Sequence, residues 1–268
     1  MYSIAIIKNK LDKILTKNSA LLKLGLTPFF ITYLKNSKNR LRSHKLFGKK
    51  LFYINGSDLL HSLKEIFIEE VYKINFKTKP IIIDCGANIG LSSLYFNLHY
   101  PDADIIAFEP DNENFEILRM NIESYGIKNI ELRKEAVWSK NDVLHFKSMN
   151  SLGSMITKEG GDDTYEVKAV RLKDVLPEKV GLLKMDIEGA EYEVIKDIEN
   201  DLYKIDNMFI EYHGYFNNQV ELNDILNLLT KSGFKFYIKE ACNIYTTPFA
   251  KESTDHPYEI QLNIFCFR

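Results

Sequence analysis

Residues 81–90, IIIDCGANIG, decide the fold class of this 268-residue chain. Three consecutive isoleucines, Ile81–Ile83, are typical of a strand that is buried on both of its faces. Gly86 and Gly90 then mark a tight turn, and residues 91–99 follow as a helix. A strand, a glycine turn and a helix in this order predict one unit of a parallel sheet that is covered by helices.

The same pattern recurs along the chain. We expect further strands at 105–108, 130–133, 182–185 and 208–212, and further helices at 112–125, 190–199 and 219–232. Two final strands, 234–240 and 259–267, are joined by a long loop, and the last has no crossover helix before it. The sequence therefore predicts an α/β, Rossmann-like fold with a mostly parallel sheet, an antiparallel last strand and helices on both faces.

Composition narrows the class of protein. Apolar residues make up 45% and charged residues 27%, as in ordinary globular domains. Three cysteines without a C-x-x-C motif exclude a disulfide scaffold and a zinc ribbon, and they favour a reducing, cytoplasmic setting. The uncharged stretch 24–34 has eleven residues, whereas a helix that crosses a bilayer needs about 20. We expect no secretory signal and no membrane crossing.

Charge is concentrated at one end of the chain. Residues 1–50 hold twelve Lys and Arg and a single acid, whereas the remainder holds 23 bases and 36 acids. We predict a basic helical N-terminal extension over 1–55, broken near residues 25–28, and an α/β domain over 56–268 that begins with a helix capped by Ser57 or Asp58. Peripheral contact of residues 1–50 with an anionic membrane is one interpretation, and packing against the core or against a second copy in a homo-oligomer is the other. No nucleic-acid partner is expected, because no binding motif is present and the body is acidic.

The first turn carries chemical information. Asp84 precedes Gly86, so the motif is D-x-G-x-x-x-G and differs from the G-x-G-x-x-G of dinucleotide enzymes. A carboxylate at this position would repel a pyrophosphate, and it suits a ligand that is cationic near the turn. The sulfonium and ammonium groups of S-adenosylmethionine meet that requirement.

A second acid follows at the tip of the next strand. Glu109 lies 25 residues after Asp84, near the spacing at which an acid accepts hydrogen bonds from ribose hydroxyls. Nicotinamide enzymes use the same contact, so an NAD(P)-dependent oxidoreductase stays open as an alternative. The missing third glycine and the lack of a Tyr-x-x-x-Lys pair disfavour it. A non-catalytic interaction module that retains the fold is the other alternative.

Four segments together resemble the FkbM family of S-adenosylmethionine-dependent methyltransferases. They are 83–90 (IDCGANIG), 108–110 (FEP), 136–137 (AV) and 183–191 (LKMDIEGAE), and the resemblance covers roughly residues 60–240. It implies a methyltransferase fold, S-adenosylmethionine as cofactor, and O-methylation of a saccharide or related small metabolite, as in polysaccharide biosynthesis. The expected cofactor-binding residues are Asp84, Gly86, Ala87, Asn88, Gly90, Glu109, Pro110, Glu135, Ala136 and Asp186.

Three residues are predicted to carry the chemistry. Asp186, at the tip of strand 182–185, would orient the acceptor hydroxyl or accept its proton, and Glu188 would position the acceptor. His213 is the predicted general base, because an unperturbed imidazole titrates near neutrality. Structural roles are the alternatives: a helix cap for Asp186, the helix dipole for Glu188 and a surface position for His213. Lys184, unusual in an apolar strand, is predicted to form a buried ion pair with Asp186 or Glu211.

Two further features stay open. Asp186, Glu188, Glu211 and His213 offer enough ligand atoms for magnesium, but their spacing is not that of a dedicated metal motif, so no metal is predicted. Residues 150–155 carry turn signals and either fold over the acceptor or form a surface hairpin.

Overall fold

The computed structural model describes residues 21–37, 39–148, 154–157, 164–250 and 256–268. Its main sheet has seven strands in the order β12-β13-β11-β10-β3-β4-β5. Five of them are joined to one another by parallel pairing: β3 (Ile81–Cys85), β4 (Asp104–Phe108), β5 (Ile130–Arg133), β10 (Leu182–Met185) and β11 (Asn207–Gly214). The strand β13 (Ile260–Phe267) pairs antiparallel with both β11 and β12 (Lys235–Glu240). The predicted mixed sheet with an antiparallel last strand is confirmed.

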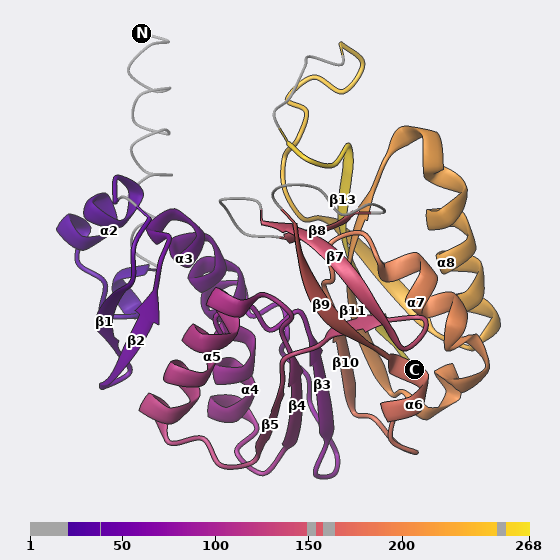
Figure 1. Ribbon diagram of the computed structural model, residues 1–268, viewed down its shortest axis with the longest axis horizontal. Coiled ribbons are helices and arrows are strands. Elements are labelled where there is room, and N and C mark those ends of the chain that lie inside the picture. The colour runs from indigo at the N-terminus through magenta and orange to yellow at the C-terminus, as the bar shows by residue number, and fades with distance from the viewer. Residues whose placement is uncertain (1–20, 38, 149–153, 158–163, 251–255) are drawn as a thin grey trace, which may run out of the picture.

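Helices cover both faces of this sheet (Figure 1). One face carries α4 (Leu91–His99) and α5 (Asn112–Tyr125); the other carries α6 (Leu172–Val175), α7 (Glu191–Asp197) and α8 (Gln219–Lys231). Short 3₁₀ turns, η2 (Glu199–Lys204) and η3 (Phe216–Asn218), precede β11 and α8. The predicted bounds of α5 are confirmed because its ends are strongly marked: the Asp111 side chain caps the first turn, and Gly126 ends the helix with a left-handed backbone.

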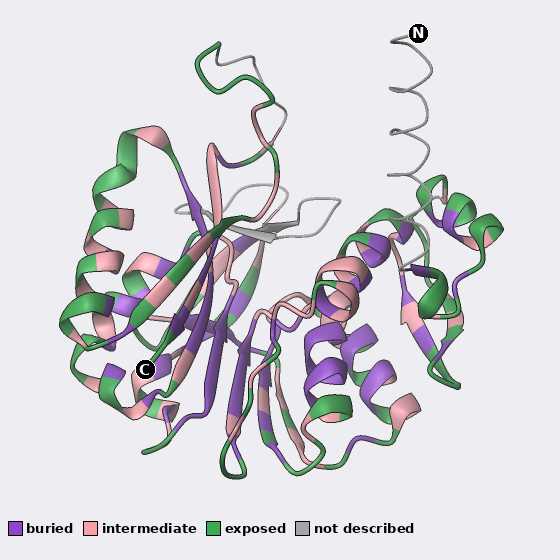
Figure 2. Cartoon of the chain, turned by 180° about the vertical axis from the view of Figure 1, so that it is seen from behind, coloured by how far each residue is buried: buried purple, intermediate pink, exposed green. Residues whose placement is uncertain are grey.

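Burial is greatest in the central strands and in the helix faces turned toward them (Figure 2). All four residues of β10 are buried, as are the last four of β3. Strands buried on both faces need apolar side chains at consecutive positions, which is why both are mostly apolar; Asp84 and Lys184, the one charged residue in each, pair with one another.

A second, four-stranded sheet lies within residues 136–171. Its strands are β6 (Ala136–Trp138), β9 (Thr164–Arg171), β7 (Asp142–Ser148) and β8 (Ser154–Thr157), in that order. The sequence did not predict this sheet. Of the segment 150–155, expected to be a flap or hairpin, residues 150–153 lie outside the described residues.

The N-terminal region departs from the all-helical expectation. The helix α2 (Pro28–Lys35) begins at the predicted break, but β1 (Arg42–Leu46) and β2 (Lys49–Tyr53) form an antiparallel hairpin. Phe47 and Gly48 between them both have positive φ, 48° and 82°, as the tightest hairpin turns require. The helical part of the predicted extension is therefore wrong for residues 42–53, and residues 1–20 lie outside the described part.

The segment after the hairpin differs in detail from the helix that was predicted to begin the α/β domain. The helix α3 (Gly56–Leu63) is capped by the side chain of Asn55, which accepts from the backbone amides of Ser57 and Asp58. The predicted cap at Ser57 or Asp58 is therefore wrong. A single π-helical turn, η1 (Lys64–Ile68), continues the helix.

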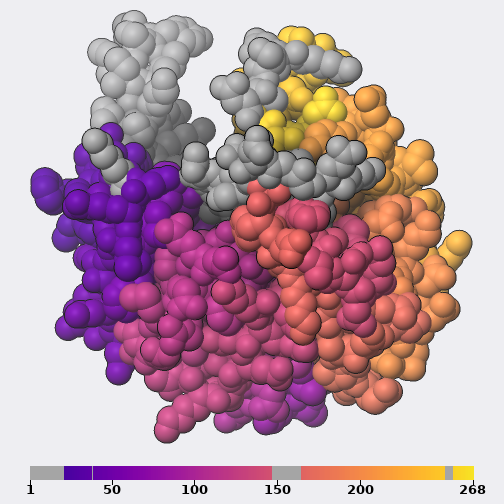
Figure 3. Space-filling view, in the orientation of Figure 1, coloured from indigo at the N-terminus to yellow at the C-terminus, as the bar shows by residue number. Residues whose placement is uncertain are grey.

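The hairpin packs on α5. The Asn121 side chain bonds both the amide and the carbonyl of Phe52, at 2.6 and 3.0 Å, and the Tyr125 hydroxyl donates to the Leu46 carbonyl at 2.7 Å. Leu46 and Leu51 are buried in the same core as the sheet residue Ile82. Figure 3 shows this segment, in indigo, against the magenta middle of the chain. Packing against the core is therefore confirmed for the described part of the extension.

No described helix combines the length and the apolar composition that a membrane-spanning helix needs.

Candidate active site

The first crossover turn is held between the tips of two strands. The amides of Gly86 and Ala87 donate to the carbonyl of Phe108, at the end of β4, at 3.0 and 2.9 Å. Gly86 has φ +81°, and a Cβ there would lie 1.9 Å from the carbonyl oxygen of Asp186, beyond β10. Only glycine allows the turn to pass so close to the neighbouring backbone.

Asp84 lies behind this turn. Its Oδ2 accepts from the hydroxyls of Ser92 and Ser93, each at 2.7 Å, and its side chain is fully buried. Neither Asp84 nor Gly90 lines the two cavities that adjoin this turn. At Gly90 a Cβ would lie 2.6 Å from the side chain of Leu118 in α5. Direct contact of either residue with a ligand stays a prediction.

Lys184, in the middle of β10, is buried and joins several groups of the turn. Its Nζ lies 3.3 Å from Oδ2 of Asp186 and 3.6 Å from Oδ1 of Asp84, and it donates to the carbonyls of Cys85 and Gly86. Burial lowers the pKa of Lys184, but Asp186 and Asp84 outweigh it and raise the pKa above its usual range. The predicted ion pair with Asp186 is confirmed.

A smaller cavity of about 70 Å³ opens between the tips of β3, β4 and β10 and the second sheet. It gathers most of the predicted cofactor-binding residues. Those lining it are Gly86, Asn88, Glu109, Pro110, Glu135, Ala136 and Asp186. Phe146, from β7 of the unpredicted sheet, and Phe108, at the end of β4, also line it. The cavity thus combines a polar edge with an aromatic wall, the combination that holds a nucleoside.

Glu109 is fixed at the polar edge of this cavity. Its two carboxylate oxygens accept from the backbone amides of Asn88, at 2.7 Å, and Asp111, at 2.9 Å. Burial raises the pKa of Glu109 to about 8, against the opposite effect of these hydrogen bonds. A carboxyl group held rigidly at a strand tip is suited to accept from a ribose diol.

A larger cavity of about 340 Å³ adjoins the smaller one. Ala87 is on its turn side, Arg40 and His61 are contributed by the N-terminal region, and Glu65 comes from η1. Asp186 and Glu188 line both cavities, as do Gly86, Asn88, Asp111 and Asn114. The two spaces therefore meet at the carboxyl tip of β10.

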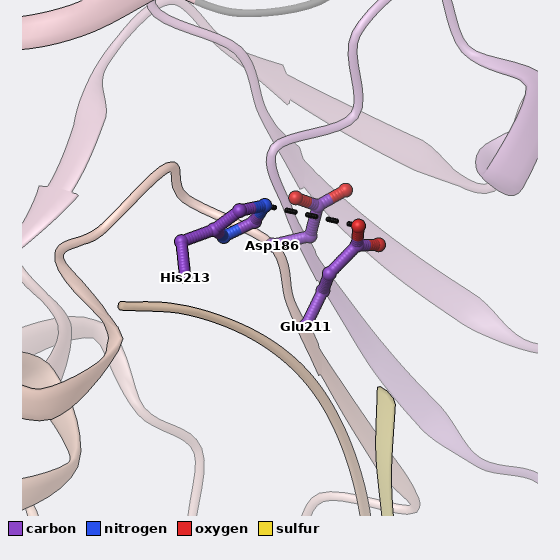
Figure 4. Close-up of side chains that lie close together, drawn as sticks. All are labelled: Asp186, Glu211 and His213. Atoms are coloured by element: carbon purple, nitrogen blue, oxygen red, sulfur yellow. Dashed lines mark ion pairs between the residues drawn. The ribbon is translucent and has the colours of Figure 1, made fainter. Parts of the chain in front are cut away.

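Glu211 and His213, at the end of β11, stand beside Asp186 (Figure 4). Glu211 lines the larger cavity. His213 lines neither cavity; its Nδ1 lies 3.1 Å from Oε1 of Glu191, and its Nε2 lies 3.7 Å from carboxylate oxygens of both Glu188 and Glu211.

The pKa values of this group are strongly displaced. Burial lowers the pKa of His213, but the three surrounding glutamates raise it to about 10. Burial raises the pKa of Glu188 to about 7 and that of Glu211 to about 8. The expectation that His213 titrates near neutrality is therefore wrong for this arrangement, because three carboxylates surround the ring.

Three residues in contact with this cluster were not predicted from the sequence as part of the site. Glu191 accepts from the amides of Ile187 and Gly189 as well as facing His213. Gln261, opposite His213 on β13, donates to Glu211 and lies 3.2 Å from Nε2 of His213. Tyr258 donates to the carbonyl of Glu188, at 2.8 Å, and packs on the ring of His213. The only sequence signal for Glu191 was its place as an acid at the end of the segment LKMDIEGAE. Tyr258 lies in the long loop before the last strand and Gln261 lies just after it, and no sequence motif marks either residue.

A family profile described as "Methyltransferase FkbM domain" matches residues 84–236, more than half of the chain. The chain belongs to the FkbM methyltransferase family. The matched region contains both the cofactor turn and the tips of β10 and β11. The chain is therefore a methyltransferase, and the oxidoreductase and the non-catalytic alternatives are both set aside.

Curated relatives agree with this assignment. Methyltransferase sdnD of Sordaria araneosa is 29% identical over 180 residues, which cover 53% of this chain and 70% of the relative. The 31-O-demethyl-FK506 methyltransferase FkbM of Streptomyces tacrolimicus is 24% identical, over 70% of this chain and 86% of its own. The hexuronic acid methyltransferase AglP of Haloferax volcanii is 27% identical over an alignment that covers 57% of this chain and 62% of the relative.

Among solved structures, methyltransferase FkbM of Methylobacillus flagellatus superposes with a TM-score of 0.51 at 15% identity. The match covers 79% of this chain and 54% of that one. At this level of identity the similarity shows the fold alone, which is that of the S-adenosylmethionine-dependent methyltransferases.

Proposed function

We propose that this methyltransferase binds S-adenosylmethionine across the two cavities and transfers its methyl group to a hydroxyl of a saccharide or related metabolite. One observation carries the proposal: Asp186 and Glu188 line both cavities. A methyl group leaving the cofactor must pass from one space to the other, so the residues at the shared wall are those that meet the reacting atoms.

The adenosine part fits the smaller cavity. Ala136 leaves room for a flat ring, Phe146 offers an apolar face to it, and Glu109 is placed to accept from the ribose hydroxyls. The methionine part then runs past Gly86 toward Asp186. Its positive groups meet a wall that is rich in carboxylates, which favours binding of a cation.

The chemistry follows from this placement. The acceptor oxygen attacks the sulfonium methyl; a C–O bond forms as the C–S bond breaks, and S-adenosylhomocysteine is the leaving group. Asp186 orients the hydroxyl and, with Glu188 beside it, supplies the carboxylates that accept its proton. His213 lies behind these two residues and, held by Glu191, acts as a positioning residue in place of the general base expected from the sequence.

A polyhydroxylated acceptor fits the larger cavity. Its wall is polar, with Asn55, His61, Glu65 and Glu211 among the lining side chains, and carboxylates are good acceptors for several hydroxyl groups at once. The relative AglP supports this acceptor class, because its name gives a hexuronic acid as its substrate.

Calorimetry with S-adenosylhomocysteine and with NAD tests the cofactor. We expect saturable binding of the thioether and none of the dinucleotide. Binding of NAD alone would contradict the proposal. Acceptors are then screened by the formation of S-adenosylhomocysteine from S-adenosylmethionine with uronic acids, neutral hexoses and a macrolide; turnover with the macrolide alone would contradict the saccharide class.

Asp186→Asn tests the shared wall. We expect this variant to bind S-adenosylhomocysteine and to lose turnover by about 10²-fold or more, because general acid–base groups contribute at least this much. Asp102→Asn, an exposed substitution in a turn before β4, is the matched control and should keep full activity. Undiminished turnover of Asp186→Asn would show that another group accepts the proton.

We also propose that the basic N-terminal region contacts anionic lipid. Residues 21–57 hold eight Lys and Arg and no acid, and the aromatic ring of Phe29 is 84% exposed. Basic and exposed apolar side chains on one segment favour the interface of a charged membrane.

A further inference from the structure

Two carboxylates and one imidazole converge beside the larger cavity. Asp186 follows β10, and Glu211 and His213 end β11, the neighbouring parallel strand. Each offers one ligand atom, and the three atoms lie within 4.8 Å of one another (Figure 4). Two carboxylate oxygens and one imidazole nitrogen at this separation can bind a single ion between them.

The imidazole is oriented from behind. Nδ1 of His213 faces Oε1 of the fully buried Glu191, which also accepts from the amides of Ile187 and Gly189. In a neutral imidazole whose Nδ1–H donates to Glu191, Nε2 carries the lone pair; this atom lies 3.7 Å from Glu211 and 3.2 Å from the amide nitrogen of Gln261, which a bound ion would displace. A carboxylate bonded to the outer nitrogen of a histidine is the usual support of a metal-binding imidazole.

A buried oxygen without a partner lies on the same face of the sheet. Asn263 sits directly opposite Glu211 in the β11–β13 pair, so the two side chains point to one face. Its amide nitrogen donates to Glu65, at 2.9 Å, but its carbonyl oxygen is buried and has no hydrogen-bond partner among the residues that the structure describes. Such an atom in a native protein points to a bound water or ion.

Acidic side chains outnumber the basic ones, Arg40, His61 and Lys184, around the larger cavity. Glu65 and Glu188 line the same cavity as Asp186 and Glu211. The buried Lys184 is already placed between Asp84 and Asp186. Carboxylates that are crowded in a partly buried site are stabilised by a bound cation.

From these four observations we infer that Asp186, Glu211 and His213 bind one divalent metal ion of the Mn²⁺ or Mg²⁺ class. Carboxylate-rich sets with a single imidazole suit these ions, and the side that faces the cavity leaves coordination positions for water or for an acceptor oxygen. The inference rests on the proposed function: it adds to it that the acceptor hydroxyl binds the metal. A metal-bound hydroxyl loses its proton more readily, and Glu188 receives that proton as the C–O bond forms.

Mn²⁺ is the probe for the test. Chain stripped with EDTA is titrated with MnCl₂, with and without S-adenosylhomocysteine, and binding is followed by calorimetry and by loss of the free Mn²⁺ signal in electron paramagnetic resonance. We expect one ion per chain. Asp186→Asn and His213→Gln should abolish saturable binding, and Glu191→Gln should weaken it by about 10- to 100-fold, as loss of a supporting carboxylate does.

His61→Gln is the matched control, since His61 lines the same cavity but lies outside the triad. This variant should bind Mn²⁺ as the wild type does. Thermal unfolding of each variant identifies those that fail to fold, and Glu211→Gln is a further triad variant for that case.

The outcomes separate the two proposals. Binding of S-adenosylhomocysteine without saturable binding of Mn²⁺, or Mn²⁺ binding that the triad variants leave unchanged, overturns the metal site and leaves His213 in an ion-pair network. Mn²⁺ binding that depends on the triad, without any binding of S-adenosylhomocysteine, supports the metal site and contradicts the proposed cofactor.

Discussion

Gly86 is the residue at which the cofactor turn and the tip of β10 come closest. An alanine Cβ there would meet the Asp186 backbone at 1.9 Å, whereas at Gly126, which also has a positive φ, it would meet nothing within 4 Å. Gly126→Ala should lose about 1–2 kcal/mol through its left-handed backbone alone. Gly86→Ala should lose roughly 3–5 kcal/mol, because backbone must also move. Urea unfolding measures both, and equal losses would show that the close approach is absent.

The raised pKa of Glu109 predicts that cofactor binding depends on pH. Its pKa of about 8 means that the carboxyl is mostly protonated at pH 7, whereas ribose hydroxyls bind best to the ionised form. The affinity for S-adenosylhomocysteine should therefore rise roughly tenfold between pH 7 and pH 9. By the same linkage, the ligand-free fold loses stability as pH rises from about 4.5 toward 8, because burial disfavours the ionised carboxyl.

The control for this prediction is Glu109→Gln. In calorimetry, the variant should lose the pH dependence that Glu109 supplies and keep the part that comes from Glu188 and from the ligand's own amino group. Identical slopes for the two proteins would remove Glu109 from the ribose contact.

Single residues of the site were predictable where they end a strand. Glu109, Asp186 and Glu211 could be placed together from sequence because parallel strands bring their carboxyl ends to one edge. The environment of His213 could not be predicted from sequence, because the three glutamates that raise its pKa come from separate positions that only the packed structure brings together. Phe146 was missed for the same reason.

Among elements, β3 and β10 depend on each other through one buried charge. Lys184→Met would leave Asp84 fully buried with two serine hydroxyls as partners, and should cost about 3–5 kcal/mol of stability. Adding Asp84→Asn removes the uncompensated charge, so the double variant should be more stable than Lys184→Met alone. Denaturant unfolding in a double-mutant cycle measures this coupling. Strictly additive losses would show that the two side chains do not interact.

Predictability also differed between elements. The strands β5 and β10 and the helices α4 and α5 have the bounds expected from sequence, because buried strands and capped helices carry strong local signals. The β1–β2 hairpin was read as helix because its basic residues hid the strand alternation. The sheet of β6 to β9 was missed since its pairing joins segments up to about 30 residues apart, which no local pattern specifies.

On the scale of the whole molecule, charge is distributed asymmetrically about the active site. The basic segment 21–57 lies on one side of the sheet, and α8 lies on the other (Figures 1 and 3). Within α2, Ile31 and Leu34 are buried against the core, while Phe29 is exposed. The same segment contributes Arg40 and Asn55 to the larger cavity. A surface that contacts lipid there would place the cavity mouth near a membrane-bound acceptor.

Flotation with lipid vesicles tests this placement. Deleting residues 1–50 would remove Leu46, which is buried in the core, so substitutions are the sharper experiment. We expect the full chain to bind vesicles that contain phosphatidylserine and to leave neutral vesicles unbound.

The double variant Lys23→Glu with Lys35→Glu should weaken binding to these vesicles by roughly 30-fold or more, since each basic residue near an anionic surface contributes about 1 kcal/mol and each charge reversal also adds repulsion. Lys231→Glu with Lys235→Glu, at the end of α8 and the start of β12, changes net charge equally and should leave binding intact. Equal weakening by both pairs would mean that net charge, and not the N-terminal surface, drives the association.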